Sequence, residues 1–313
     1  MKKIIWTVDP YANNKALDQH IIKFIQTLEK DRLVEIYPVY IMTPNRVNVP
    51  AELIFPHVDL FFDQAQKILD RKLKSVKLTG LQPPQVLVRP SYTNKGDVED
   101  LDRYAIKLGA DLIVAGTHTR TGAARFFLGS FAETLLLYSR TPIVVIGPKS
   151  KAPGAIRHIL FPTDLGTDSV QEFDRLLGFA KEYGAKVTIA HFVQQPLVVL
   201  PGSRALVAEQ KFTQLQLLAA EKRAAALVVQ ARKYGVAAKV WVSECEGSMS
   251  EEITDLARKL GVQLIAMVPQ SGRLKATLIG SMARQVVRAA DRPVWLLHES
   301  KAKAKPSRRS KAA

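Results

Sequence analysis

The apolar and polar residues of this chain alternate between two spacings. Short runs of consecutive apolar residues, such as Ile4–Val8, are typical of strands buried on both faces. Between these runs, apolar residues recur every three or four positions, as from Leu17 to Leu28, which indicates helices with one buried face. Asn13 or Asn14 is placed to cap the first of these helices. Strands that alternate with helices predict an α/β fold of parallel strands joined by right-handed crossovers.

Each half of the chain is predicted to follow the same order of elements. In the first half we expect strands at 4–8, 33–41, 86–88, 112–115 and 143–146, and helices at 14–28, 58–78, 98–108 and 131–138. In the second half we expect strands at 159–161, 187–192, 239–242, 264–268 and 294–297, and helices at 169–183, 207–234, 249–260 and 281–290.

The two halves are related by an internal repeat as well as by pattern. The segment from Glu99 to Val114 aligns with residues 251–266 at an offset of 152, with identical residues at seven positions. Apolar runs ending in Asp9 and Asp164 lie 155 positions apart, and two Gly-Ser pairs lie 151 apart. The repeat predicts two tandem doubly wound domains, each a five-stranded parallel sheet with helices on both faces.

Composition places the boundaries of these domains. The segment at 148–155 is rich in Gly, Pro and Lys, and is predicted to link a domain at 1–147 to a domain at 156–300. We also expect the second half to pack on the first as an internal pseudo-dimer. A homodimer of the whole chain is a further possibility.

Charge and cysteine content narrow the class of protein. No apolar run is long enough to span a bilayer, and the single cysteine, Cys245, excludes an intrachain disulfide and favours a cytoplasmic protein. The net charge is +16, of which six basic residues lie in the tail at 301–313. This tail is predicted to be disordered. It is interpreted as a solubilising segment, with binding to nucleic acid or an anionic membrane as the alternative.

Candidate chemistry gathers where the strands end. Ligands of doubly wound sheets bind outside the carboxyl ends of the strands, at the point where strand order reverses. Asp9 and Asp164 follow the first strand of each half, and Gly116 ends the fourth strand of the first half. A Gly-Ser pair then precedes a helix, whose free N–H groups and dipole favour a phosphate. The spacing matches neither the P-loop nor the dinucleotide fingerprint.

These residues resemble the universal stress protein family in its tandem form. Nucleotide-binding members carry G-x-x-G, nine residues and then G-[ST] after the fourth strand, with an Asp after the first. The resemblance implies that Asp9 contacts the adenosine of ATP, with or without magnesium. It implies that the phosphates are held by Gly116, Thr119, Gly129 and Ser130. Thr119 departs from the family pattern, which has glycine there. Because family dimers often join through the last strand, the resemblance also implies that the strands at 143–146 and 294–297 pair, which would cover two exposed edges.

The second half retains less of this pattern. Asp164, Gly280 and Ser281 transfer to a second candidate site, but the loop at 268–273 has lost its first glycine and is one residue shorter. We expect that site to be weaker, altered or empty. The alternative interpretation is structural: both aspartates would cap their own turns and both Gly-Ser pairs would only start a helix.

The sequence therefore predicts a stress-response regulatory protein that binds an adenine nucleotide mainly in its first half. No acid, base or nucleophile stands out, so efficient catalysis is not expected, although slow ATP hydrolysis remains compatible with the sequence. No metal ligand set is predicted. The alternative is a scaffold that binds nucleic acid, anionic lipid or a protein through its basic surface. A nucleotide-dependent enzyme of the related adenine-binding α/β group is a third, weaker alternative.

Overall fold

The computed structural model describes residues 1–43, 58–88, 93–117, 130–194, 203–269 and 281–298. The first half contains, in chain order, β1 (Lys3–Thr7), α1 (Lys15–Glu29), β2 (Glu35–Met42), α4 (Val58–Leu73), β3 (Gln85–Val88), α5 (Asn94–Leu108), β4 (Leu112–Gly116), α6 (Ser130–Tyr138) and β5 (Ile143–Ile146). The second half contains β6 (His158–Pro162), α7 (Thr167–Tyr183), β7 (Lys186–Gln194), α8 (Ser203–Tyr234), β8 (Ala238–Cys245), α9 (Met249–Lys259), β9 (Leu264–Met267), α10 (Ser281–Ala289) and β10 (Val294–Leu296).

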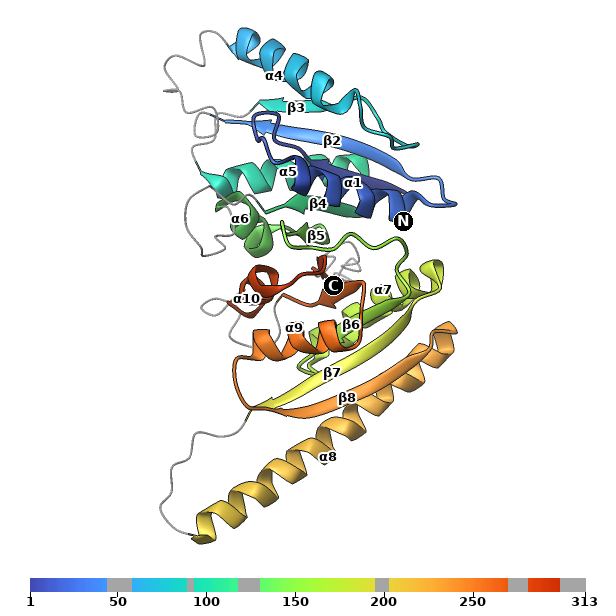
Figure 1. The fold of residues 1–313 in the computed structure, drawn as a ribbon, viewed down its shortest axis with the longest axis vertical. Helices are drawn as coiled ribbons and strands as arrows, with labels where there is room; N and C mark the ends of the chain where they lie inside the picture. Colours follow the sequence, from blue (N-terminus) through green and yellow to red (C-terminus); the bar gives the residue numbers. More distant parts are fainter. Residues whose placement is uncertain (44–57, 89–92, 118–129, 195–202, 270–280, 299–313) are drawn as a thin grey trace, which may run out of the picture.

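The strands of both halves form one continuous sheet of ten strands (Figure 1). Their order is β3-β2-β1-β4-β5-β10-β9-β6-β7-β8, so each half has the same strand order read outward from the centre. Strands within a half are parallel, whereas β5 and β10 pair antiparallel, with Val144 opposite Trp295. This confirms the predicted doubly wound halves and the predicted pairing of the two last strands.

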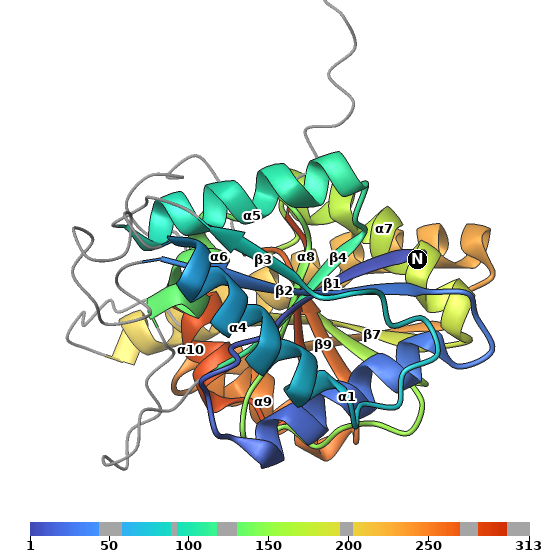
Figure 2. The same cartoon turned by 90° about the horizontal axis from the view of Figure 1, so that it is seen from above.

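Helices cover both faces of this sheet because alternate strand residues face opposite sides. Ile4 and Trp6 of β1 belong to one buried cluster, together with apolar residues of α1, α4, α7 and α8. Ile5 belongs to a second cluster, to which α5, α6, α9 and α10 contribute. Seen along the row of strands, the strands cross at the centre and the helices surround them (Figure 2). The continuous apolar runs are therefore explained by burial on both faces.

Several element boundaries differ from the predicted ones. Asn14, rather than Asn13, caps α1 by accepting a hydrogen bond from the Leu17 N–H. The helix predicted over 58–78 ends at Leu73, where a turn forms as the Val76 N–H bonds the Leu73 carbonyl. The helix predicted from residue 207 begins at 203, and the strand predicted over 239–242 extends to Cys245.

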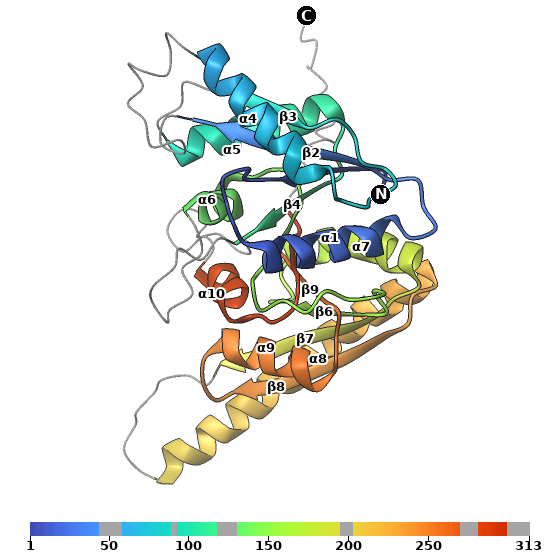
Figure 3. The same ribbon diagram turned by 45° about the horizontal axis from the view of Figure 1, so that its top comes forward.

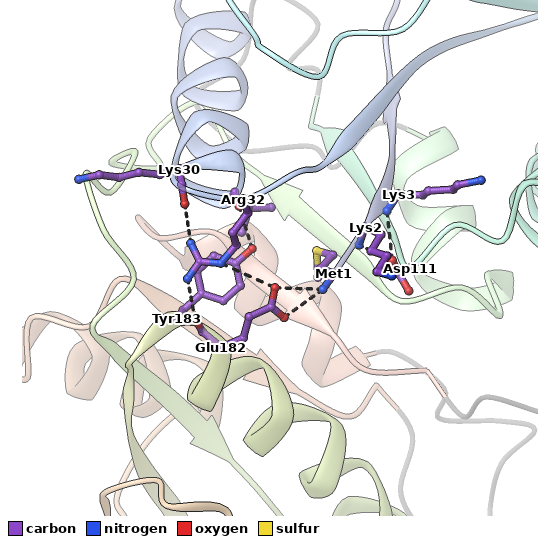
Figure 4. Close-up of polar contacts among 9 residues, drawn as sticks. Met1, Lys2, Lys3, Lys30, Arg32, Asp111, Glu182 and Tyr183 are labelled. Carbon is purple, nitrogen blue, oxygen red and sulfur yellow. Dashed lines mark hydrogen bonds and ion pairs between the residues drawn. The ribbon is translucent and has the colours of Figure 1, made fainter.

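A polar joint connects the halves away from the paired strands (Figure 4). Arg32, just after α1, places its guanidinium carbon 4.0 Å from the centre of the Tyr183 ring at the end of α7. Its Nε lies 3.7 Å from a carboxylate oxygen of Glu182, and the Tyr183 hydroxyl donates to the Leu28 carbonyl at 2.9 Å. Burial of this hydroxyl raises the pKa of Tyr183 above its ordinary value. The joint ties α1 of the first half to α7 of the second.

The two ends of the sheet are the outer strands of the two halves. One end consists of β3 with α4, and the other of β8 with the long helix α8 (Figures 1 and 3). None of the helices in the described ranges combines the length and the apolar composition that a bilayer crossing requires.

Candidate functional site

The carboxyl ends of β1 and β4 lie side by side, as the sequence predicted. The two strands pair in parallel with Trp6 opposite Val114, which brings Asp9 and Gly116 to the same edge of the sheet. The chain leaves β1 toward β2 on one side, whereas β4 lies on the other, so this edge is the switch point of the first half. β6 and β9 pair in the same way in the second half.

Asp9 is half-buried and shapes the turn that follows β1. Its Oδ1 accepts a hydrogen bond of 2.9 Å from the Tyr11 N–H, so the predicted capping role is present. In the described ranges, no residue donates to the other oxygen, Oδ2. The Tyr11 ring packs edge-on against Tyr40 of β2, with centroids 5.9 Å apart. Partial burial and the charge of Asp9 raise the pKa of Tyr11. One carboxylate oxygen of Asp9 therefore has no donor among the described residues and lies near Tyr11.

Gly116 has a packing role at the same edge. A Cβ built on it would lie 2.9 Å from the Ile21 side chain and 3.0 Å from that of Leu17. The glycine thus lets α1 pack closely against the end of β4, in addition to the turn that the sequence predicted there. The next residue, Thr117, is buried and donates its N–H to the Ile146 carbonyl.

The candidate phosphate residues are placed only in part. The helices predicted after the two Gly-Ser pairs are both present, α6 over Ser130–Tyr138 and α10 over Ser281–Ala289. Three other candidates, Thr119, Gly129 and Gly280, lie outside the described residues. The basic tail at 301–313 also lies outside them.

Helices α6 and α10 contact each other across the two halves. Glu133, in the first turn of α6, pairs with Arg288 in the last turn of α10. A carboxylate at a helix start competes with phosphate for the positive end of the helix dipole. The Arg288 guanidinium offsets that negative charge, so the second half contributes to the electrostatics of α6.

In the second half, Asp164 is more heavily used within its own loop. Its Oδ1 accepts hydrogen bonds from the Gly166 N–H at 2.9 Å and the Ser169 hydroxyl at 2.7 Å. Leu165, between Asp164 and Gly166, has a left-handed backbone with φ of 58°. Asp164 therefore holds the start of α7, which is the structural alternative that the sequence left open.

Two histidines and the single cysteine lie inside the fold. His158 and His298 are buried, and Cys245 is buried with its thiol 3.4 Å from the Gly247 carbonyl. Within the described residues, His, Cys, Asp and Glu side chains form no group of three or more that would suit a metal ion.

Sequence reasoning missed one pair of residues at the candidate sites. Lys72 of α4 and Arg223 of α8 lie 151 positions apart, and each donates to a carbonyl in the loop that follows the first strand of its half. The repeat offset is the signal that would have found them, because the two Gly-Ser pairs have the same offset.

Comparisons with known proteins agree with this architecture. The model of the universal stress protein family matches residues 1–147 and 155–298. Universal stress protein MJ0531 of Methanocaldococcus jannaschii is 32% identical over 152 residues, which are 48% of this chain and 84% of that protein.

A solved structure shows the same fold at low identity. A universal stress protein from Archaeoglobus fulgidus covers 96% of this chain and 97% of its own, with 16% identity and a TM-score of 0.64. A smaller protein of this kind from Archaeoglobus fulgidus, solved in complex with dAMP, covers 45% of this chain and 97% of its own, with 20% identity and a TM-score of 0.31. The complex with dAMP describes that protein and not this chain. Since the family model matches both halves, this chain belongs to the universal stress protein family.

Proposed function

We propose that this protein is a stress-response regulator that binds ATP in its first half, without efficient catalysis. The observation that carries the proposal is the carboxylate of Asp9 at the switch point, with Oδ2 free of hydrogen bonds from the described residues. A carboxylate in this position suits the hydroxyl groups of a ribose, which donate hydrogen bonds. The phosphates would then extend toward the start of α6 at Ser130, where N–H groups and the helix dipole favour an anion.

The two halves would differ in their use of this site. Asp164 already accepts two hydrogen bonds on one oxygen and holds the start of α7, so it has less capacity left for a ligand. We therefore propose one main nucleotide per chain, in the domain at 1–147, with the domain at 156–300 packed on it as an internal partner. The segment at 148–155 is the proposed boundary between them.

Calorimetric titration of ATP and AMP, with and without magnesium, into the full chain tests the proposal. The native chain is expected to bind near one equivalent. Gly129→Asp places a negative side chain where phosphate would lie, and should weaken ATP binding at least about tenfold. The matched control is Gly280→Asp, the same change at the same repeat position in the second half, which should leave binding within about twofold of native.

Absence of both heat and thermal stabilisation by ATP in the native chain would refute the proposal. Equal losses in the two variants would refute the assignment to the first half. The scaffold alternative would then be tested by RNA and anionic-vesicle binding at several salt concentrations. Its signature is a steep salt dependence that deletion of 301–313 abolishes.

A further inference from the structure

Lys72 makes two hydrogen bonds to the loop after β1 and an ion pair with α1. Its Nζ donates to the Asp9 carbonyl at 2.9 Å and to the Ala12 carbonyl at 3.0 Å, and lies 2.9 Å from Oδ2 of Asp18 in α1. Two of its three N–H donors are therefore used on the loop, and the ion pair with Asp18 holds the ammonium group in place. The side chain is 18% exposed, which limits competition from water. Lys72 thus ties the loop between β1 and α1 to α4.

These contacts restrict the backbone from which the Asp9 side chain projects. The preceding N–H, that of Val8, donates to the Val39 carbonyl of β2, and the Asp9 carbonyl accepts from Lys72. The side chain is then turned by its own bond to the Tyr11 N–H. With the backbone held at Val8 and at the Asp9 carbonyl, and the side chain held by the Tyr11 N–H, the direction of the Asp9 carboxylate is restricted before any ligand arrives.

The second half repeats the device with a different cation. Arg223 of α8 donates to the Leu165 carbonyl at 2.5 Å, in the loop that follows β6. The register of the two helices agrees with this correspondence, because the buried residues Leu69 and Leu73 of α4 match Ala220 and Ala224 of α8 at the same offset of 151. Asp18 has no acidic counterpart in the second half. The buried residues of α1 and α7 align at an offset of 152, which places Val170 at the position of Asp18.

We propose that Lys72 is a positioning residue for nucleoside recognition, acting through the Asp9 loop rather than by contact with the ligand. This inference rests on the proposed nucleotide site. It assigns the pre-organisation of that site to a cation from α4, a helix that carries none of the candidate ligand residues. Pre-organised ligand groups bind more tightly because less conformational freedom is lost on binding.

The test measures binding of adenosine, AMP and ATP to the full-length native chain and to Lys72→Met, which keeps the length of the side chain but removes its donors. Since Asp9 is assigned to the nucleoside, Lys72→Met should weaken all three ligands by the same factor, about tenfold. Lys72→Arg restores a cation and should return binding to within about threefold of native. Arg223→Met, the matched change in the second half, should leave binding within about twofold of native.

Each outcome decides between distinct failures. No binding by the native chain refutes the proposed function, and this inference with it. Native binding together with unchanged affinity in Lys72→Met refutes the inference alone. A loss confined to ATP and AMP, with adenosine unaffected, would show that Lys72 acts on phosphate charge, and also refutes it. If Lys72→Met unfolds, Lys72→Arg provides the test instead. A folded Lys72→Arg variant whose binding falls outside about threefold of native contradicts positioning by a cation.

Discussion

Asp102 is a buried acid that connects two parts of the first half. Its carboxylate is 1% exposed on α5 and joins that helix to the turn between α6 and β5. It accepts hydrogen bonds from the Ser139 hydroxyl at 3.1 Å, the Arg140 N–H at 2.7 Å and the Thr141 N–H at 3.3 Å. Asp102→Ala removes the acceptor of all three donors while leaving them in place.

The expected cost follows from what each donor retains. The Ser139 hydroxyl also bonds the Thr141 carbonyl at 2.9 Å, so it keeps a partner, whereas the two amide groups lose theirs. A buried donor without an acceptor costs about 1–3 kcal/mol. The Thr141 amide is buried and the Arg140 amide is part-buried, and the Arg140 guanidinium also loses its ion pair of 3.5 Å with the carboxylate. Together these losses give a destabilisation of about 3 kcal/mol for Asp102→Ala. For a domain of 150–250 residues, this corresponds to a fall in Tm of about 6–12 °C.

Urea unfolding followed by circular dichroism, with thermal melts in parallel, measures this cost. The matched control is Thr254→Ala, since Thr254 stands at the repeat position of Asp102, is also buried, and makes one hydrogen bond of 3.1 Å to the Glu251 carbonyl. Its loss should cost about 1 kcal/mol. If Asp102→Ala lies within about 1 kcal/mol of native, or if the control costs as much, the carboxylate does not hold this turn as we infer.

Two further predictions use the repeat and the buried histidines. Gly109 and Gly261 have left-handed φ of 69° and 61°, and Gly109→Ala and Gly261→Ala should each cost about 1 kcal/mol in urea unfolding, with additive effects; a cost in only one half would contradict the equivalence of the two positions. Burial lowers the pKa of His158 and His298 from 6.5, with the charge of Lys186 adding to the effect at His158. The unfolded chain then binds more protons than the folded chain below about pH 6.5, so the urea midpoint should fall from pH 7.5 to pH 5.5. His298→Gln should reduce that fall, and an equal fall of the urea midpoint in this variant would refute the assignment to His298.

The order and type of the elements were predictable because the spacing of apolar residues along the chain reflects which faces of each element are buried. Runs such as Ile143–Ile146 are apolar throughout since both faces of the strand are covered. The pairing of β5 with β10 was predicted from the resemblance to family dimers, because edge exposure alone would fit the outer strands β3 and β8 equally well. Boundaries were less predictable, since the end of α4 at Leu73 depends on a turn rather than on a change of apolar spacing.

The supporting residues of the candidate site were not predictable from spacing within one half. Lys72 lies 63 positions along the chain from Asp9, whose carbonyl it contacts. From the sequence alone, nothing distinguishes it from the other lysines of the chain. Asp102 likewise appears as an ordinary helical acid until the turn at Ser139 is folded against it. Only the comparison of the two halves singles out Lys72, because Arg223 supplies a cation at the same repeat position.

The antiparallel contact between β5 and β10 also determines how this chain is free to diverge. In an assembly of two identical subunits, every substitution appears twice, at both ends of the interface. Here the two surfaces that meet are encoded separately, so a change in one is not imposed on the other. Glu133 faces Arg288 with no reciprocal pair, since Leu137 stands at the repeat position of Arg288. Covalent linkage thereby fixes a one-to-one pairing of two unequal halves, and allows one to specialise while the other supports it.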